Sequence, residues 1–221
     1  MAFGEIMQRF TWEILDANSW LLVENDCGLL FDPVDSSALY GAISGLKELL
    51  IVLTHCHFDH ICGLNHIRNI RSDACVIATS ACSERICRSS GNLSNIANVL
   101  MAFHKHNDRI EDIIDPFSCK AADRTFQKEL DIEWQNHKLR LEEYNGHSRG
   151  GLCCEIDGST LITGDTLLPI PTITRLPGGS TRAFWEEDMP RLTAMKERIK
   201  IVCPGHGEPG QIDEMLSINK R

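Results

Sequence analysis

The chain has 221 residues, of which 43% are hydrophobic and 24% are charged, and its formal net charge is -9. This length and hydrophobic content allow one sizeable core, so we expect residues 1–221 to form a single domain. The acidic balance and the lack of a basic run argue against a nucleic-acid partner, because phosphate binding relies on clustered Lys and Arg.

Charged side chains interrupt the N-terminal segment at Glu5, Arg9, Glu13 and Asp16, so we expect neither a signal peptide nor a membrane span there. No later segment has membrane-spanning length, and we expect no membrane partner. The ten cysteines lack C-x-x-C spacing, and without an export signal they are expected to be reduced thiols. These features predict a cytoplasmic protein.

Three short strands are predicted at the start of the chain, over 12–15, 20–23 and 29–31, in a β-meander. Ser36 or Ser37 can cap a helix that extends to about Leu46. The apolar run from Leu49 to Leu53 predicts a buried strand. A helix over 63–70 followed by a strand over 75–78 then indicates a parallel crossover.

Residues 81–119 differ in character from the rest. Apolar side chains from Leu93 to Ile114 fall largely at helical spacing, and Asp115 before Pro116 is a plausible end. We expect one or two helices inserted over the core.

The second half of the chain begins with a predicted strand over 138–144. Strands over 152–156 and 160–163 are joined around Asp157 and Gly158, which is a strong hairpin signal. A loop over 169–180, a helix over 186–199, a strand over 201–203 and a helix from Ile212 complete the chain.

Four potential metal ligands follow the buried strand directly, in the pattern His55-x-His57-x-Asp59-His60. Neutral imidazole and carboxylate are ligands that zinc, iron and manganese accept. A catalytic site needs further ligands from other parts of the chain. A rigid strand that leads into a short loop can direct such groups at one point, so we predict a metal site here.

The downstream candidates are His147, Asp165 and His206, each directly after a glycine that lets the backbone turn sharply. In an antiparallel hairpin, the start of the first strand lies beside the end of the second. His147 precedes the first hairpin strand and Asp165 follows the second, so both should reach the same edge of the sheet.

The order His-x-His-x-Asp-His, single His, single Asp and last His resembles the metallo-β-lactamase superfamily of binuclear metal hydrolases, from about Trp12 to His206. Gly164-Asp165-Thr166-Leu167 and Pro204-Gly205-His206-Gly207 are most similar to its glyoxalase II branch. The resemblance implies an α/β fold of four layers, an αββα sandwich, with a helical insertion between the first and second ligand motifs.

Carried onto this chain, the resemblance assigns His55, His57 and His147 to one metal and Asp59, His60 and His206 to a second, with Asp165 bridging the two. It implies two divalent cations, with zinc expected first and iron or manganese as alternatives. A metal-bound hydroxide would attack the carbonyl carbon of a small-molecule substrate such as a thioester or lactone. Asp59 would be the catalytic residue that orients this nucleophile and shuttles a proton.

Two departures from the glyoxalase II pattern bear on the substrate. Tyr144-Asn145-Gly146 replaces Thr-Pro-Gly before the lone His, and the chain ends soon after His206, without the helical extension that contributes to glutathione binding. These features favour a lactone or another acyl thioester. Arg149, Arg175, Arg182 and Trp185 lie near the ligand loops in sequence and are candidates for substrate contact.

Two other functions stay open. One is an iron-dependent persulfide dioxygenase, although that branch carries Gly-Arg-Thr-Asp where this chain has Leu168-Pro169-Ile170-Pro171. The other is a metal-stabilised binding protein without turnover. We expect no metal-binding role for the remaining histidines (His66, His104, His106 and His137), and Cys56 should point away from the metals.

Overall fold

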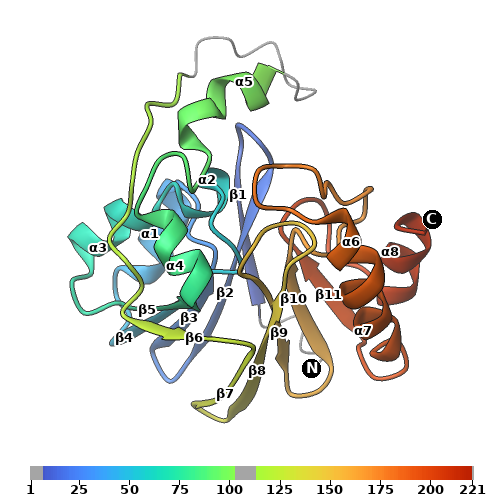
Figure 1. Cartoon of the computed structure of the whole chain (residues 1–221). Helices are drawn as coiled ribbons and strands as arrows, with labels where there is room; N and C mark the ends of the chain where they lie inside the picture. Colours follow the sequence, from blue (N-terminus) through green and yellow to red (C-terminus); the bar gives the residue numbers. More distant parts are fainter. Residues whose placement is uncertain (1–6, 103–112, 221) are drawn as a thin grey trace.

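The computed structural model describes residues 7–102 and 113–220. In this part of the chain, two β-sheets face each other and helices cover their outer faces (Figure 1). The arrangement is the predicted αββα sandwich. None of the described helices is long and apolar enough to cross a membrane.

The first sheet has the order β1-β2-β3-β4-β5-β6. Its strands are β1 (Met7–Trp12), β2 (Ala17–Glu24), β3 (Cys27–Phe31), β4 (Glu48–Val52), β5 (Cys75–Thr79) and β6 (Arg124–Phe126). The first three form the expected antiparallel meander, whereas β3 to β6 run parallel. The connections contain α1 (Ser37–Ile43), α3 (Leu64–Ile70) and α4 (Ser80–Ile86).

The second sheet has the order β11-β10-β9-β8-β7. Its strands are β7 (Glu129–Trp134), β8 (His137–Tyr144), β9 (Gly151–Ile156), β10 (Thr160–Gly164) and β11 (Ile201–Pro204). All neighbours are antiparallel except β10 and β11. Its outer face carries α6 (Thr181–Ala183), the π-helix η3 (Phe184–Asp188), α7 (Met189–Ala194) and α8 (Ile212–Ile218) (Figure 1).

Strand β4 leads into the first ligand motif and is buried on both sides. Ile51 belongs to the core under the helices, whereas Val52 belongs to the core between the two sheets. This double burial explains why the strand reads as a continuous apolar run. Burial of such a side chain stabilises the fold by about 1.5–3 kcal/mol, so the carboxyl end of β4 is a rigid base for the residues that follow.

Several predicted boundaries are wrong for local reasons. The first strand ends at Trp12 instead of Leu15, because residues 13–16 form the turn that pairs Trp12 with Ala17. Helix α1 is capped by Ser36 as expected but ends at Ile43. The helical segment predicted over 186–199 starts at Thr181, where the Ser180 hydroxyl accepts a hydrogen bond from Ala183 N, and it ends at 194.

The range 81–119 contains most of α4, the 3-10 helix η2 (Ser94–Ile96) and α5 (Ala97–Ala102). Ile113 and Ile114 were expected in a helix but lie outside one, and Ile114 N donates to the Asn98 side chain at 2.9 Å. The expected helical positions Phe103 and Ile110 lie outside the described residues. The prediction missed β6, which has only 3 residues, and β7, in which exposed acidic residues alternate with apolar residues that face the core.

Candidate metal centre

Seven potential ligands lie where strands of both sheets end. His55 follows β4, His57 precedes the short helix α2 (Phe58–Ile61), and Asp59 and His60 belong to that helix. The other three ligands follow strands of the second sheet: His147 follows β8, Asp165 follows β10 and His206 follows β11.

The side chains form two groups of three. The ligand atoms of His55, His57 and His147 lie within 4.8 Å of one another, as do those of Asp59, His60 and His206. In the first group, His57 Nδ1 is 3.0 Å from His147 Nε2. In the second group, His60 Nε2 and His206 Nε2 are 3.2 Å apart.

Asp165 lies between the two groups. Its Oδ1 is 3.3 Å from His60 Nε2, and its Oδ2 is 3.5 Å from both His147 Nε2 and His206 Nε2. The hairpin of β9 and β10 therefore brings His147 and Asp165 to one edge of the sheet. One carboxylate contacts imidazoles from both groups.

These separations fit metal coordination. A tetrahedral site with metal–nitrogen distances of about 2.0–2.1 Å separates neighbouring ligand atoms by about 3.3 Å. In addition, Nε2 of His55 is buried without a hydrogen-bond partner among the described residues, an arrangement that costs free energy unless a partner binds. The imidazole and carboxylate donors suit zinc, iron or manganese.

Backbone carbonyls fix two of the imidazole rings. His147 Nδ1 donates to the carbonyl oxygen of Ile173 at 2.7 Å, and His206 Nδ1 donates to that of Leu15 at 3.0 Å. A ring nitrogen that faces a carbonyl oxygen must carry the proton. Nε2 of each ring is therefore the unprotonated atom of the neutral form, and it faces the cluster.

Asp32 fixes a third ring, and the sequence analysis did not identify it as a functional residue. This buried carboxylate accepts hydrogen bonds from the backbone and side chain of Thr54, and its Oδ2 is 3.2 Å from His60 Nδ1. Asp32 also lies within 4.8 Å of the His55 and His60 ligand atoms. Because Thr54 donates to both of its oxygens and Oδ2 also lies beside His60 Nδ1, we interpret Asp32 as a support for His60.

The two groups differ in electrostatics. Burial lowers the pKa of His57 to about 3, so this ring is neutral at pH 7. Burial also opposes the charged form of His206, but Asp165 and Asp59 raise its pKa to about 10. Burial raises the pKa of Asp59, yet the neighbouring His60 and His206 outweigh it and lower this pKa to about 2. The carboxylates thus favour positive charge within the second group.

Two glycines permit the close approach of the ligand loops. A Cβ atom on Gly205 would overlap Asp165 Oδ1 and lie 2.8 Å from His60 Cε1. Gly164 has a φ of +48°, and a Cβ atom there would overlap the Thr54 side chain. The glycine before each of these ligands is therefore a packing requirement.

The ligand cluster opens into a cavity of about 270 Å³, which is lined in part by His57, Asp59, His147, Asp165 and His206. Of these residues, His206 is the most exposed, with 18% of its side chain accessible. The ligands are therefore shielded from bulk solvent but can be reached by a small molecule.

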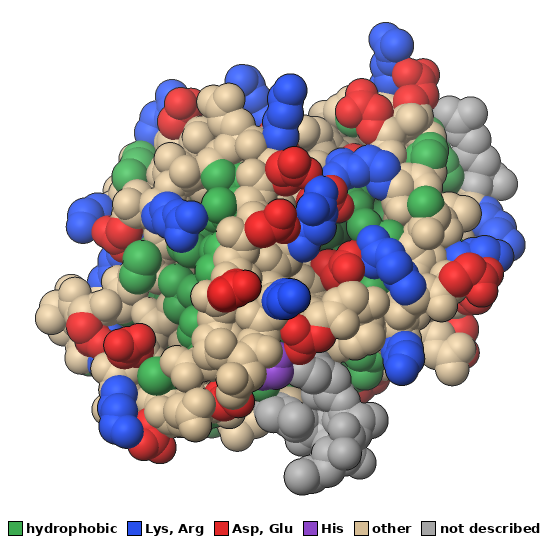
Figure 2. Space-filling model, turned by 90° about the horizontal axis from the view of Figure 1, so that it is seen from below, with side chains coloured by type: hydrophobic (Ala, Val, Ile, Leu, Met, Phe, Trp, Pro, Cys, Tyr) green, Lys and Arg blue, Asp and Glu red, His purple; other side chains and the backbone are tan. Residues whose placement is uncertain are grey.

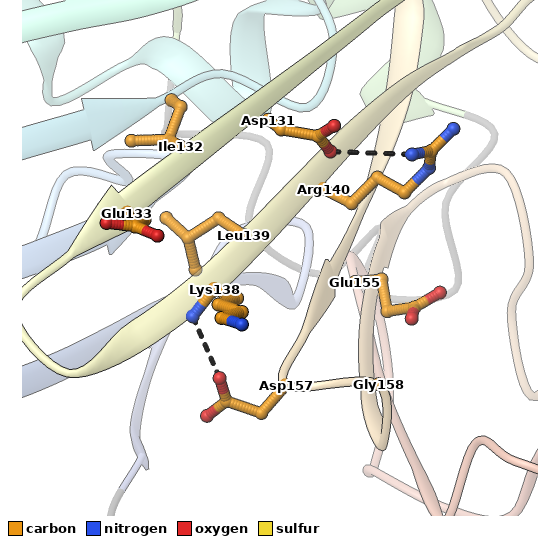
Figure 3. Close-up of a pocket in the computed structure, with 9 residues that line it drawn as sticks. All are labelled: Asp131, Ile132, Glu133, Lys138, Leu139, Arg140, Glu155, Asp157 and Gly158. Atoms are coloured by element: carbon orange, nitrogen blue, oxygen red, sulfur yellow. Dashed lines mark hydrogen bonds and ion pairs between the residues drawn. The ribbon is translucent and has the colours of Figure 1, made fainter.

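A second hollow lies between β7, β8 and the β9–β10 turn (Figure 3). Charged residues of its wall interact with one another: the Arg140 guanidinium lies 3.5 Å from the Asp131 carboxylate, and the Asp157 carboxylate accepts a hydrogen bond from Lys138 N. The turn is at the opposite end of the β9–β10 hairpin from His147 and Asp165. Acidic and basic side chains are also interspersed over the lower face of the molecule (Figure 2).

The candidate substrate contacts Arg149, Arg175, Arg182 and Trp185 are not among the residues that line the 270 Å³ cavity. Arg149 and Arg175 are exposed, and Arg182 pairs with Glu186 at 2.7 Å. Trp185 packs edge-on against Phe184. Their proximity in sequence to the ligand loops does not bring them to the cavity.

Three further residues from the sequence analysis, His66, His137 and Cys56, make contacts outside the two ligand groups. His66 stacks on Tyr40 with ring centroids 4.1 Å apart, and His137 lies 2.6 Å from Asp157. Cys56 Sγ accepts a hydrogen bond from Arg85 Nε at 3.0 Å. His104 and His106 lie outside the described residues.

Comparison with known proteins identifies the family. A family model described as the metallo-beta-lactamase superfamily matches residues 12–206. The chain belongs to this superfamily. A probable metallo-hydrolase of Bacillus subtilis (strain 168), YqgX, is 40% identical over 198 residues, which cover 87% of this chain and 86% of that protein. A hydroxyacylglutathione hydrolase of Prochlorococcus marinus is 24% identical over 199 residues, which cover 86% of this chain and 65% of that protein.

Solved structures agree on the fold. The B3 metallo-beta-lactamase BLEG-1 matches with a TM-score of 0.75 and 22% identity, covering 96% of this chain and 97% of that one. TTHA1623, solved in a di-iron-bound form, matches with a TM-score of 0.72 and 22% identity, covering 96% and 98%. Superfamily membership and relatives named as hydrolases support hydrolase activity for this chain.

Proposed function

We propose that this superfamily member is a binuclear metal-dependent hydrolase of thioesters or lactones. The observation that carries the proposal is the position of Asp165, whose two carboxylate oxygens lie within 3.5 Å of imidazoles from two separate ligand groups. A carboxylate in this position suits two cations that share a substrate.

His55, His57 and His147 would hold one cation, Asp59, His60 and His206 would hold the other, and Asp165 would contact both. Bound there, the cations would supply Lewis-acid chemistry: polarisation of a carbonyl oxygen and a decrease in the pKa of water from about 15.7 to about 7. Zinc is the first expectation. Iron and manganese fit the same donors.

Asp59 has the role of a catalytic residue in this proposal. Its carboxylate lines the cavity, and its Oδ2 lies 3.4 Å from His206 Nε2. As a carboxylate, Asp59 can accept a hydrogen bond from the attacking water. This orients the water towards the carbonyl carbon. Asp59 takes up the proton that the water loses on attack and donates it to the leaving sulfur or oxygen as the bond to the carbonyl carbon breaks.

Elemental analysis of protein purified without added metal tests the first part of the proposal, and two equivalents of metal per chain are expected. The metallated protein is then assayed on acyl thioesters and lactones. A sample with two equivalents that hydrolyses neither class would contradict the proposal.

The Asp59→Asn variant tests the catalytic role. Loss of the proton-accepting carboxylate should lower kcat by about 100-fold or more, while the Tm stays within a few degrees of the native value. Asp131→Asn is the control, because Asp131 is an exposed aspartate in the second hollow, and it should leave kcat unchanged. Native kcat in Asp59→Asn would show that this side chain has no role in the reaction.

A further inference from the structure

The cavity next to the metal centre has an apolar wall. Apart from the five ligand residues, its lining consists of Leu15, Phe58, Leu93, Leu100, Leu168, Ile170, Ile173 and Leu176. Neither Lys nor Arg is found among the described residues of this lining. Among the described lining residues, a ligand at the ligand cluster would therefore contact only apolar side chains beyond the cluster itself.

Two segments far apart in the sequence contribute to the cavity wall. Leu93 and Leu100 belong to the helical segment that leads into and includes α5, whereas Leu168 and Ile173 belong to the loop that follows β10. Figure 1 shows α5 and the loop between β10 and α6 at the same upper end of the molecule. The reacting group of a ligand would lie at the metals, and its remainder would lie between these two segments.

Hydrogen bonds hold the loop after β10 in place. The buried Asn219 donates to the carbonyl oxygen of Leu168 at 2.9 Å and accepts from Thr172 N at 2.7 Å. The carbonyl oxygen of Ile173 accepts from His147 Nδ1 at 2.7 Å. Because its backbone is anchored at these points, the loop presents its apolar side chains without a large ordering cost on binding.

The mouth of the cavity is apolar too. Ile170 and Ile173 line the cavity, yet they are 53% and 55% exposed. The exposed apolar surface of these two side chains is available to a ligand, and its removal from water would favour binding.

We propose that the substrate of this hydrolase carries an uncharged aliphatic acyl group, which packs between Leu100 and Ile173 while its carbonyl carbon lies at the metal centre. The inference rests on the proposed function and names its substrate class. The acyl groups of a thioester and of a lactone share this chemistry. An acyl group with an ionised end would lose hydration in this cavity without gaining a cationic partner from the described lining.

Binding of reaction products tests the proposal independently of turnover. Calorimetry on the metal-loaded protein compares butanoic, hexanoic and octanoic acid with succinic, adipic and suberic acid, the dicarboxylic acids of the same chain lengths. Each buried methylene should strengthen binding of the monocarboxylic acids by about fourfold, and each dicarboxylic acid should bind more weakly than its monocarboxylic counterpart. Equal affinity along the monocarboxylic series, or equal affinity for the two acids of a given length, would overturn the proposal.

The Ile173→Lys variant reverses the chemistry of the wall while retaining the backbone carbonyl that binds His147. It should weaken octanoic acid binding by about tenfold or more and strengthen suberic acid binding. Ile70→Lys is the matched control, because Ile70 is 47% exposed on α3 and does not line the cavity. Identical behaviour of the two variants would contradict the assigned wall.

Hydrolysis of the corresponding acyl thioesters separates this proposal from the function on which it rests. Binding that strengthens with chain length, without hydrolysis of any thioester or lactone, would support the apolar site and contradict the hydrolase. Hydrolysis with the same kcat/KM for every chain length and for charged acyl groups would support the hydrolase and contradict the apolar site.

Discussion

The support that Asp32 gives to His60 leads to a quantitative prediction for Asp32→Asn. The amide retains the shape of the carboxylate, and its oxygen can still accept from Thr54 N, the partner of Asp32 Oδ1 at 2.7 Å. The amide nitrogen then faces His60 Nδ1, where the native Oδ2 lies at 3.2 Å. This NH2 group favours the tautomer with the proton on Nε2, the atom that should bind the metal.

The size of the effect follows from these contacts. Loss of a partner that orients a metal-binding histidine lowers metal affinity by about 10- to 100-fold, which corresponds to about 1.4–2.7 kcal/mol. The buried Thr54 hydroxyl also loses its acceptor, Asp32 Oδ2, and a buried donor without a partner destabilises the fold by about 1–3 kcal/mol. We therefore expect weaker binding of one metal equivalent together with a decrease in Tm.

The assay is a competition titration of the apoprotein against a chromogenic chelator, with the Tm measured in parallel. Asp123→Asn is the matched control, because Asp123 also accepts from a backbone N–H, that of Val76 near the start of β5, and also pairs with a basic side chain, Arg68. It should decrease the Tm and leave both affinities unchanged. If Asp32→Asn bound both equivalents as tightly as the native protein, the orienting role of Asp32 would be refuted.

Three further predictions concern the surroundings of the metal centre. Gly205→Ala should reduce the metal content below two equivalents, because the new methyl group overlaps Asp165; Gly41→Ala, with open space around its Cβ position, should leave the metal content unchanged. Asp188 accepts a hydrogen bond from Gly146 N, next to His147, and burial raises the pKa of its carboxyl from 3.8 to about 6. The free energy of unfolding should therefore decrease by up to about 3 kcal/mol as the pH rises from about 4 through about 6. Asp188→Asn should remove this decrease in a series of Tm measurements against pH. Asn219→Ala should release the loop after β10 and raise KM more than it lowers kcat, so an unchanged KM would argue against this anchor.

Local patterns were sufficient for the elements that lie closest to the metal centre. The apolar run before His55 has the length and composition of a buried strand and is buried on both sides. The Asp157-Gly158 turn predicts which strand ends meet at His147 and Asp165. Strand β7 was missed although its sequence alternates: Leu130, Ile132 and Trp134 pack on the core between the sheets, whereas the acidic residues between them are exposed. The prediction was wrong for Ile113 and Ile114, which lie outside a helix, and Ile114 N donates to the Asn98 side chain.

The supports of the metal centre have no comparable signature in the sequence. Every residue has a carbonyl oxygen, so nothing in the sequence distinguishes those of Leu15 and Ile173, which fix two imidazole rings. Asp32 looks like a residue that ends a strand. Its role depends on the parallel pairing of β3 with β4, which brings it beside Thr54 and the helix that carries His60.

The amino-acid sequence by itself determined the types of ligand, their order and the short-range pairing of His147 with Asp165, because strand, turn and cluster are properties of neighbouring residues. Local patterns did not bring His206 to His60 across 146 positions of the chain; the family resemblance implied this contact, and the tertiary structure shows it together with the apolar wall of the cavity. These contacts depend on the parallel pairing of β10 with β11 and on the packing of the two sheets. Such pairings are selected by the burial of the whole core, and no local pattern specifies them.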